Sequence, residues 1–310
     1  MKISLCLAAY QGSKYITKQL TYILGQSLQP DEVIICDDHS TDGTAELAAD
    51  FIAKHKLAGH WQLYVNEVHK GYPENFYYGM SLCHGDVVFL ADQDDIWETD
   101  KIFHMYHQMK QRPDISLLIS DWGQADDAGC IKRRGRLGAA GKKHLIPVAV
   151  SDVLYQYVWP GMAMCYRARL GRQVLSEAGS RPPAHDMALA LKAAAEGGFY
   201  ILPRVLQYHR KHTESASLGA HLRAGRFSRN QKLSEIEQYI AQLQKITESQ
   251  LCGRAEMKEL LEEKQRLMKE RYYNLEHRRI LAMIAQYWKH RTKIRPGTLM
   301  LDMVLCRQKG

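Results

Sequence analysis

The sequence predicts an α/β protein with a mainly parallel sheet flanked by helices and a C-terminal amphipathic helical extension. Over residues 1–100, short apolar runs alternate with helical patterns, which is the order of βαβ units with right-handed crossovers. After residue 219 the chain instead shows apolar residues at helical spacing among many charges. We therefore expect a first domain at 1–215 and a basic helical extension at 216–310.

The alternating segments define the elements of the first domain in order. Apolar runs predict strands at 3–8, 32–36, 61–65 and 87–90. The periodic patterns between them predict helices at 15–24, 44–55 and 75–83. Because ligands bind at the carboxyl ends of parallel strands, the loops that follow three of these strands should converge on one cleft. Those loops are 9–12, 37–44 and 91–97.

The pattern loosens between residues 120 and 215. A helical run at 187–196 and a strand-like segment at 199–202 stand out, followed by the basic segment 206–212. In the extension, apolar residues at helical spacing on both sides of Gly253 predict two amphipathic helices joined near that glycine. We expect their apolar stripes to pack on each other or on the first domain.

The positive charge of the chain is concentrated in the extension. The net charge is +8, and residues 219–310 hold 19 Lys and Arg against 10 Asp and Glu. This asymmetry predicts an attachment surface for an anionic partner. An anionic membrane surface is favoured, because 287–295 mixes aromatic and cationic residues and the apolar run 299–306 follows. Nucleic acid is disfavoured, because no aromatic stacking residues are arranged for a binding groove.

Composition and cysteine usage indicate a cytoplasmic protein. The seven cysteines are scattered and lack CxxC spacing, which favours free thiols in a reducing compartment and argues against zinc. The N-terminal apolar run is read as a first strand rather than a signal peptide. No segment approaches the ~18 apolar residues that a membrane span requires.

The strongest candidate site is the acidic cluster Asp92, Asp94 and Asp95, which directly follows the strand predicted at 87–90. Carboxylates at the end of a buried strand need a cation or a donor, because burying an unpaired charge is costly. Hard oxygen ligands suit Mg²⁺ or Mn²⁺, which commonly also bind the phosphates of a nucleotide-linked substrate. The alternative is a solvated acidic turn.

The loop 37–44 allows three interpretations. A calcium-binding loop fails, because Ala49 stands where a bidentate Glu is required. Ser40 or Thr41 is expected to cap the helix that begins near residue 44. Asp37 and Asp38 are also expected to accept hydrogen bonds from a bound base, which would favour uracil or thymine over cytosine. No GxxxxGK[ST] or GxGxxG motif is present, so phosphates would be met by a metal and by cationic side chains.

Two further residues are candidates for chemistry. Asp186 lies in the predicted first turn of a helix, where the helix dipole favours its ionised form, and an ionised carboxylate can act as a general base toward an acceptor hydroxyl. His212 could contact a metal or a diphosphate. The alternatives are an ordinary first-turn acid for Asp186 and a basic surface loop for 206–212.

Taken in order, these motifs resemble the family 2 inverting glycosyltransferases, specifically the rhamnosyltransferase-like branch. The resemblance covers residues 1–215 and is most specific in DDxSxDGT at 37–44 and DQDDIW at 92–97. It also includes Asn75-Phe76, Pro160-Gly161, His185-Asp186 and the segment 208–212. It implies a GT-A fold, a UDP- or dTDP-sugar donor, dTDP-rhamnose included, a bound Mg²⁺ or Mn²⁺, and direct displacement with inversion at the anomeric carbon.

The resemblance also implies a role for each matching residue. Tyr10 and Asp38 would hold the base, Asp37 would support them, and Asp186 would be the catalytic base. The remaining nucleotide-binding residues would be Ala8, Asn75, Asp92 and Gln93. The metal would be bound by Asp94, Asp95 and His212, with Asp94 as the direct ligand. The acceptor or sugar pocket would include Trp97, Gly161 and His185.

Some positions depart from the family pattern. Gln11 stands where Asn is commoner, His39 replaces a small residue, and the segment 135–141 matches no pattern. These departures bear on sugar specificity more than on the reaction. The expected function is transfer of a sugar to a glycan or lipid-linked glycan acceptor in bacterial surface polysaccharide biosynthesis, at the inner face of the cell membrane. The alternative is a non-catalytic module that binds a nucleotide sugar or glycan. It is disfavoured because all three acidic groups are present: Asp37 with Asp38, the cluster of Asp92, Asp94 and Asp95, and Asp186.

Overall fold

The computed structural model describes residues 1–133, 135, 142–155, 159–211, 228–253 and 255–307. The chain divides into two compact units. Unit 1 comprises Met1–Ala149 and Val158–Lys211, and unit 2 comprises Val150–Tyr157 and His212–Gly310. The short segment Val150–Tyr157 therefore belongs with the C-terminal helices, although it is flanked in sequence by unit 1.

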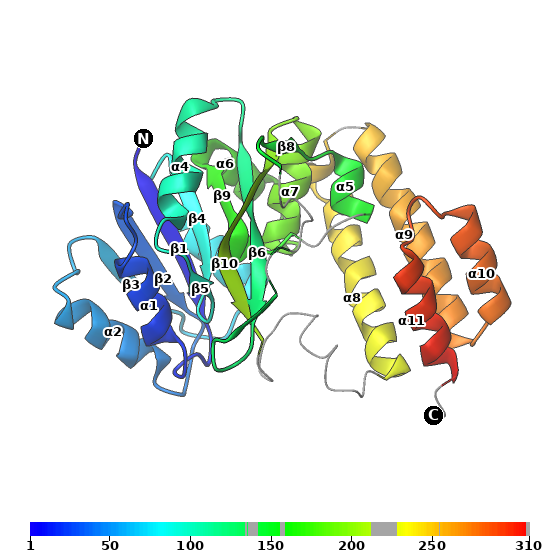
Figure 1. Cartoon of the computed structure of the whole chain (residues 1–310), viewed down its shortest axis with the longest axis horizontal. Helices are drawn as coiled ribbons and strands as arrows, with labels where there is room; N and C mark the ends of the chain where they lie inside the picture. Colours follow the sequence, from blue (N-terminus) through cyan, green and yellow to red (C-terminus); the bar gives the residue numbers. More distant parts are fainter. Residues whose placement is uncertain (134, 136–141, 156–158, 212–227, 254, 308–310) are drawn as a thin grey trace. The chain divides into compact units, whose positions relative to one another are not determined.

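Unit 1 is built on one mixed sheet (Figure 1). Along the sheet the strand order is β3-β2-β1-β4-β9-β6-β10-β5, and β7 and β8 pair with β6 and β10. The strands β1, β2, β3 and β4 run parallel, whereas β9 is antiparallel to both β4 and β6. The strands are β1 Ile3–Ala9, β2 Glu32–Asp37, β3 Trp61–Val65, β4 Val87–Asp92, β5 Ile96–Trp97, β6 Leu117–Ala125, β7 Ile131–Arg133, β8 Ile146–Pro147, β9 Met164–Arg167 and β10 Phe199–Arg210.

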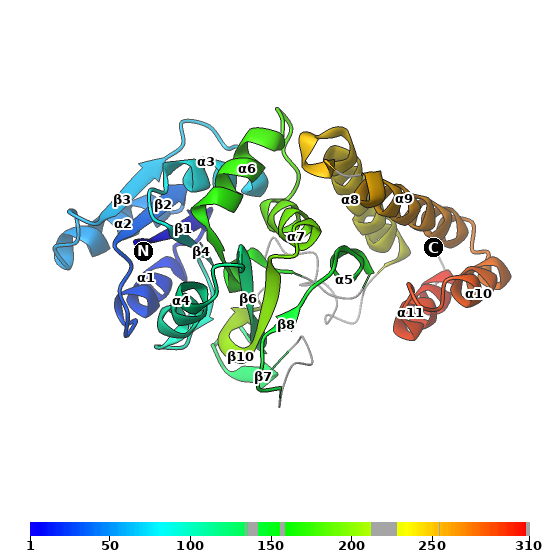
Figure 2. The ribbon, with the colours of Figure 1, turned by 90° about the horizontal axis from the view of Figure 1, so that it is seen from above.

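Helices cover both faces of this sheet. Figure 2 shows α1, α2 and α4 on one face and α3, α6 and α7 on the other. Because both faces are covered, the central strands are almost continuously apolar, and Leu5, Leu7, Ile35 and Phe89 are fully buried. The helical elements are α1 Ile16–Leu24, α2 Thr44–Lys54, α3 Tyr72–Leu82, α4 Lys101–Gln111, η1 Gly161–Ala163, α6 Ala168–Glu177 and α7 His185–Ala195.

The predicted α/β fold is confirmed, and two local predictions are wrong. The segment 206–210 is not a loop, because β10 continues to Arg210 and pairs with both β5 and β6. Neither Ser40 nor Thr41 caps α2. Its N-cap is Gly43, in the left-handed region at φ 90°, and the Asp42 side chain accepts the Thr44 backbone N–H instead. Glycine adopts this backbone conformation without steric cost, which moves the helix start past the two hydroxyl residues.

Unit 2 is helical. It contains α5 Val150–Tyr155, α8 Arg229–Glu248, η3 Gln250–Cys252, α9 Ala255–Glu276, α10 Ile280–Lys289 and α11 Pro296–Arg307. The two predicted helices correspond to α8 and α9, and Gly253 lies between them as expected. The sequence did not predict α10 and α11. Their residues Met283 and Leu305 join a shared core with Ile236, Met268 and Leu275. No helix within the described ranges is long and apolar enough to span a membrane.

Candidate active site

The parallel strands bring three polar loops to one edge of the sheet. In the β1–β4 register Ala8 lies opposite Asp92, and in the β1–β2 register Ala9 lies opposite Asp37. All three strands therefore end at the same level. This is the edge at which α/β sheets bind ligands, as expected from the sequence.

The loop after β2 supports the loop after β1. The Gln11 backbone N–H donates to Ser40 Oγ at 2.9 Å, and the Gly12 backbone N–H donates to Thr44 Oγ1 at 2.8 Å. Gln11 at φ 48° and His39 at φ 63° both occupy the left-handed region. Asn and His are both enriched several-fold in that region, so His39 suits its backbone conformation, whereas Gln11 stands where Asn would adopt it more readily.

Gln93 fixes the end of the loop after β1. Its side-chain amide accepts from the Tyr10 backbone N–H and donates to the Tyr10 carbonyl, both at 2.8 Å. A Cβ atom at Gly12 would lie 2.0 Å from Gln93 Oε1, so a larger residue there would displace the Gln93 amide from Tyr10. The Tyr10 side chain itself is 43% exposed, and its ring centroid lies 4.2 Å from that of His69. This exposed ring pair provides an aromatic surface of the kind on which a base can stack.

Asp38 is buried, and its carboxylate is occupied by the protein itself. It accepts the backbone N–H groups of Lys70 and Gly71, each at 2.8 Å, and its Oδ2 atom lies 2.9 Å from His69 Nδ1. The Asn66 side chain bridges Asp38 and Asn75, donating to each at 2.9 Å. Asp38 and Asn75 thus hold the segment that leads into α3.

Asp37 differs from its neighbour in its bonding. One carboxylate oxygen accepts the Ser40 backbone N–H at 2.8 Å. The other oxygen, Oδ2, is buried and has no hydrogen-bond partner among the residues that the structure describes. Of the two adjacent carboxylates, Asp37 therefore keeps an acceptor that no described residue uses.

The acidic cluster is compact and largely enclosed. Asp94 and Asp95 are 8% and 1% exposed. Burial and the charges of Asp95 and Asp94 raise the pKa of Asp92 well above its usual range, and burial raises the pKa of Asp95 as well. His209 Nδ1 lies 3.4 Å from Asp95 Oδ1, and although burial lowers its pKa, the three carboxylates outweigh this and raise it overall.

The side chains of this cluster are of the type that binds a divalent cation, but the described residues alone do not complete a metal site. The buried Asp95 Oδ2 atom lacks a hydrogen-bond partner within the described part of the chain, and like charges raise the pKa of Asp92. A cation would offset that repulsion, and carboxylate oxygens are the ligands that Mg²⁺ and Mn²⁺ prefer. The described residues include no group of three or more His, Cys, Asp or Glu side chains placed to bind a metal. The third expected ligand, His212, lies outside the described residues.

The sequence did not point to Lys101, a buried cation whose charge interacts with Asp95 and Asp92 of the acidic cluster. It is fully buried at the start of α4, with Nζ 2.6 Å from the Met162 carbonyl oxygen and 3.4 Å from the centre of the Trp97 ring. Burial lowers its pKa to about 7 against the opposing effect of Asp95 and Asp92. The sequence does contain a sign that Lys101 is buried. Position 101 precedes Met105 by four residues and Met109 by eight, which places it on the same buried face of the helix.

Trp97 lies in the core rather than on an open surface. It is 4% exposed, and its indole nitrogen has no partner among the described residues. Arg210 is also buried, and it donates through Nε to the Asp94 carbonyl oxygen at 3.0 Å. Two buried cations, Lys101 and Arg210, and the buried Trp97 ring thus adjoin the acidic cluster.

Asp186 and His185 open helix α7 beside η1. Burial raises the pKa of Asp186 to about 6, although the backbone N–H groups of Met187 and Gly161 act in the opposite direction. His185 stacks on Phe76 with ring centroids 3.8 Å apart, and burial lowers its pKa to about 3. A Cβ atom at Gly161 would lie 2.5 Å from His185 Nε2, so this glycine permits the close approach of η1 to α7.

Asp38, Asp92 and Asp186 lie in one connected region of unit 1. The charge of Asp186 contributes to the raised pKa of Asp92 and to that of Tyr72 in α3. Asp38 binds Gly71, the residue that precedes α3, and Phe76 of the same helix contacts His185. The structure therefore connects the end of β2 with the start of α7 through α3, and the charge of Asp186 acts on Asp92 at the end of β4.

Comparisons with known proteins agree with this arrangement. A family model described as Glycosyl transferase family 2 matches residues 4–168, which is more than half of the chain. Poly-beta-1,6-N-acetyl-D-glucosamine synthase of Staphylococcus epidermidis is 27% identical over 154 residues, covering 44% of this chain and 36% of that protein. The dTDP-rhamnosyl transferase RfbG of Shigella flexneri is 33% identical over 99 residues, covering 31% of this chain and 34% of that protein. The chain thus matches about a third of the length of these two relatives.

A solved structure shows the same architecture. The mannosyltransferase PcManGT from Pyrobaculum calidifontis, in complex with GDP-Man and Mn²⁺, superposes with a TM-score of 0.61 and 16% sequence identity. The superposition covers 97% of this chain and 78% of that one. It confirms the glycosyltransferase GT-A fold that the sequence resemblance implied.

Proposed function

Because the chain belongs to glycosyl transferase family 2, we propose that it transfers a sugar from a nucleotide-sugar donor to an acceptor hydroxyl, with inversion at the anomeric carbon. The observation that carries this proposal is the position of Asp186. This carboxylate lies in the first turn of α7, close enough to the acidic cluster for its charge to affect Asp92, and its pKa is raised to about 6. A base with this pKa is ionised at neutral pH and still holds a proton well enough to accept one from a hydroxyl group.

The reaction would proceed as a single displacement. Asp186 would take the proton of the acceptor hydroxyl as its oxygen attacks the anomeric carbon from the face opposite the diphosphate. The neutral His185 ring, stacked on Phe76 and backed by Gly161, would keep the start of α7 in place. Asp94 and Asp95 would hold a Mg²⁺ or Mn²⁺ ion, which would offset the negative charge on the departing diphosphate.

The donor is proposed to be a UDP- or dTDP-sugar. The base would stack on the exposed Tyr10 ring. Asp37, whose buried Oδ2 atom has no partner among the described residues, would accept from a base N–H that reaches the end of β2, with Asp38 holding the adjacent segment. A carboxylate acceptor favours uracil and thymine, which carry an imino proton that cytosine lacks. The similarity to a dTDP-rhamnosyl transferase supports dTDP-rhamnose as one donor to test.

A binding screen tests the donor assignment. We expect UDP- or dTDP-sugars to raise the thermal midpoint of the protein more than CDP-sugars do, because cytosine lacks the imino proton, and we expect the shift to increase when Mn²⁺ is present. Binding without any transfer to added acceptors would favour the non-catalytic module instead. A protein that binds none of these donors, with or without Mn²⁺, would contradict the proposal.

The acceptor is proposed to be a glycan or lipid-linked glycan of bacterial surface polysaccharide biosynthesis. The similarity to a poly-N-acetylglucosamine synthase supports a carbohydrate acceptor. Such acceptors are assembled at the inner face of the membrane, so the proposed location is cytoplasmic and peripheral to that membrane.

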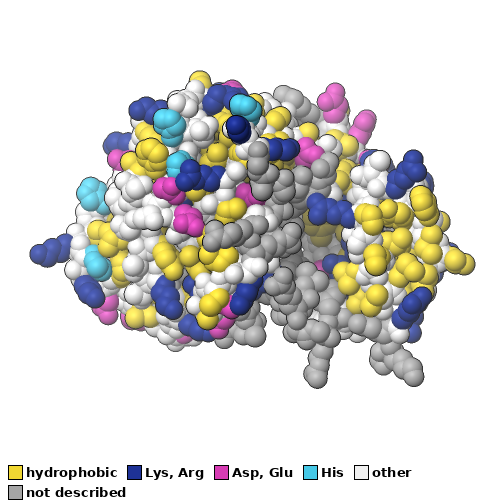
Figure 3. Space-filling model, viewed as in Figure 1, with side chains coloured by type: hydrophobic (Ala, Val, Ile, Leu, Met, Phe, Trp, Pro, Cys, Tyr) yellow, Lys and Arg dark blue, Asp and Glu magenta, His cyan; other side chains and the backbone are white. Residues whose placement is uncertain are grey.

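The surface of unit 2 supports such an attachment. Leu281 and Trp288 on α10, and Met300 and Val304 on α11, are exposed, with Leu281 at 83%. Figure 3 shows apolar side chains gathered on one face of this unit, with cationic side chains beside them. An apolar patch flanked by Lys and Arg suits the interface of an anionic bilayer.

Vesicle sedimentation checks this attachment. Deleting 286–310 is a poor test, because Gln286, Leu305 and Cys306 are buried in unit 2. We instead expect the surface variant L281S/W288S/V304S to lose about tenfold or more of its partitioning onto phosphatidylglycerol vesicles. The control Val68→Ser, an exposed apolar residue of unit 1, should bind as the wild type does. Equal sedimentation of the surface variant and the wild type would end the membrane proposal.

A further inference from the structure

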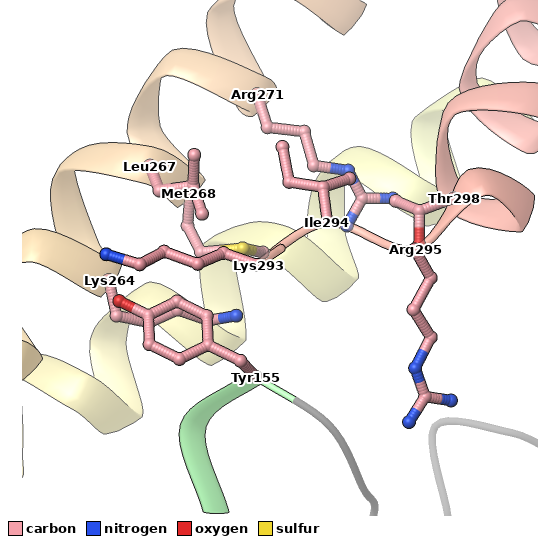
Figure 4. Close-up of a pocket in the computed structure, with 9 residues that line it drawn as sticks. All are labelled: Tyr155, Lys264, Leu267, Met268, Arg271, Lys293, Ile294, Arg295 and Thr298. Atoms are coloured by element: carbon pink, nitrogen blue, oxygen red, sulfur yellow. The ribbon is translucent and has the colours of Figure 1, made fainter. Parts of the chain in front are cut away.

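Unit 2 contains a small cavity lined by cationic side chains (Figure 4). Its volume is about 100 Å³, and residues of α5, α9, α11 and the segment before α11 surround it. The polar side chains that line it are Tyr155, Lys264, Arg271, Lys293, Arg295 and Thr298. No acidic side chain is among the described residues of this lining.

Lys264 is the most unusual of these residues. It is 8% exposed, and its ammonium lies 4.6 Å from the centre of the Tyr155 ring and 5.7 Å from that of Tyr239. Within the described part of the chain, no oxygen accepts a hydrogen bond from this ammonium. A buried ammonium without an acceptor is costly, since aromatic rings replace only part of its hydration.

The neighbouring cations differ from Lys264 because they have acidic partners. Arg271 donates to both carboxylate oxygens of Asp302 at 2.7 and 2.8 Å, and Lys293 donates to Glu263. In Figure 4 the amino groups of Lys293 and Lys264 point in opposite directions. Burial and the charge of Arg271 lower the pKa of Lys264 to about 8, and among the described residues no acidic side chain lines the cavity beside it.

The volume of the cavity limits which ligand could supply a hydrogen-bond acceptor to Lys264. The volume of about 100 Å³ is large enough for several waters or one small oxyanion. An oxyanion with several oxygens could accept from Lys264, from the remaining guanidinium N–H groups of Arg271 and from the Thr298 hydroxyl.

We propose that this cavity of unit 2 binds a phosphate group, with Lys264 as its central cation. The proposal concerns unit 2 alone and is independent of the sugar-transfer site. The phosphate could be free in solution or the exposed phosphate monoester of a lipid headgroup, and both present the same chemistry to the cavity.

The test compares Lys264→Met with the matched control Lys269→Met in the full-length protein. Both changes remove one lysine from α9, but Lys269 is exposed and does not line the cavity. Calorimetric titration with inorganic phosphate should give saturable binding for the wild type and for K269M. For K264M the dissociation constant should rise at least about tenfold, the effect expected from losing a charged hydrogen bond.

The unfolding temperature of K264M in phosphate-free buffer shows whether weaker phosphate binding results from the loss of a ligand contact or from a misfolded protein. Because Met removes an unpaired buried charge without loss of volume, K264M should unfold at the same temperature as the wild type or a higher one. Phosphate should raise the midpoint of the wild type and K269M, and at the same concentration it should raise that of K264M by less.

Vesicles containing phosphatidic acid identify the source of the phosphate. If K264M also loses binding to these vesicles relative to K269M, the cavity takes a lipid headgroup. If only the titration with inorganic phosphate changes, it takes the free ion. The proposal is overturned if the wild type binds neither probe saturably, or if K264M binds both as tightly as K269M does.

Discussion

Replacing Asp186 by asparagine is expected to lower kcat by at least about 10²–10⁴-fold, which is the range that a positioned general base contributes. The amide keeps the shape of the side chain, and its single oxygen can still accept the backbone N–H of Met187. Donor affinity should therefore remain within about twofold of the wild type, because the change removes proton transfer and leaves the base and diphosphate contacts. Turnover measured under saturating donor and acceptor checks this expectation.

The same substitution should stabilise the fold. Burial raises the pKa of Asp186 to about 6, so its ionisation at neutral pH costs folding free energy. Removing the charge should raise the free energy of unfolding by about 1–3 kcal/mol at pH 7. The gain should vanish below about pH 4, where the carboxyl is protonated in both the folded and the unfolded state.

Glu46→Gln is the matched control for Asp186→Asn. Glu46 is an exposed acid in the first turn of α2, so its replacement makes the same chemical change away from the proposed site. It should change neither turnover nor stability by a measurable amount. An Asp186→Asn enzyme that turns over at the wild-type rate would remove Asp186 from the reaction.

The second large effect is expected at the acidic cluster. Asp94→Asn should weaken Mn²⁺-dependent donor binding by about 100-fold or more, since loss of a direct ligand exceeds the 10–100-fold cost of altering an outer one. EDTA should abolish transfer by the wild type, and added Mn²⁺ should restore it. Calorimetry with donor at several Mn²⁺ concentrations measures the change.

Asp50→Asn provides the comparison for the metal experiment. Asp50 is an exposed residue of α2, so donor binding by this variant should respond to Mn²⁺ as in the wild type. Transfer that continues undiminished in EDTA would argue against the metal, and would point to Lys101 and Arg210 as the cations that balance the cluster.

Much of unit 1 follows from simple sequence patterns. Strands covered on both faces read as continuous apolar runs, which is why β1, β2 and β4 were predicted within two residues of their ends. Polar residues at the ends of these strands predicted the edge that carries the site. Asp186 was expected in the first turn of a helix, and the structure confirms that position.

The features that sequence did not predict depend on partners distant in the chain. Arg210 reads as a surface cation, but β10 buries it against the Asp94 carbonyl. Asp38 reads as a ligand contact, whereas the segment 66–71 folds back and occupies its carboxylate. Lys101 and Lys264 are lysines in helical segments, and only the packing of neighbouring elements shows that each is buried.

The central claim is that Asp186 acts as the base in a transfer reaction, and a pH profile tests it most directly. A base must be ionised to accept a proton, so kcat/KM of the wild type should rise with pH through an apparent pKa near 6 and then level off. In Asp186→Asn this acidic limb should be absent from the residual activity. A wild-type profile that is flat from pH 5 to 8, or the same limb in both enzymes, would contradict the account.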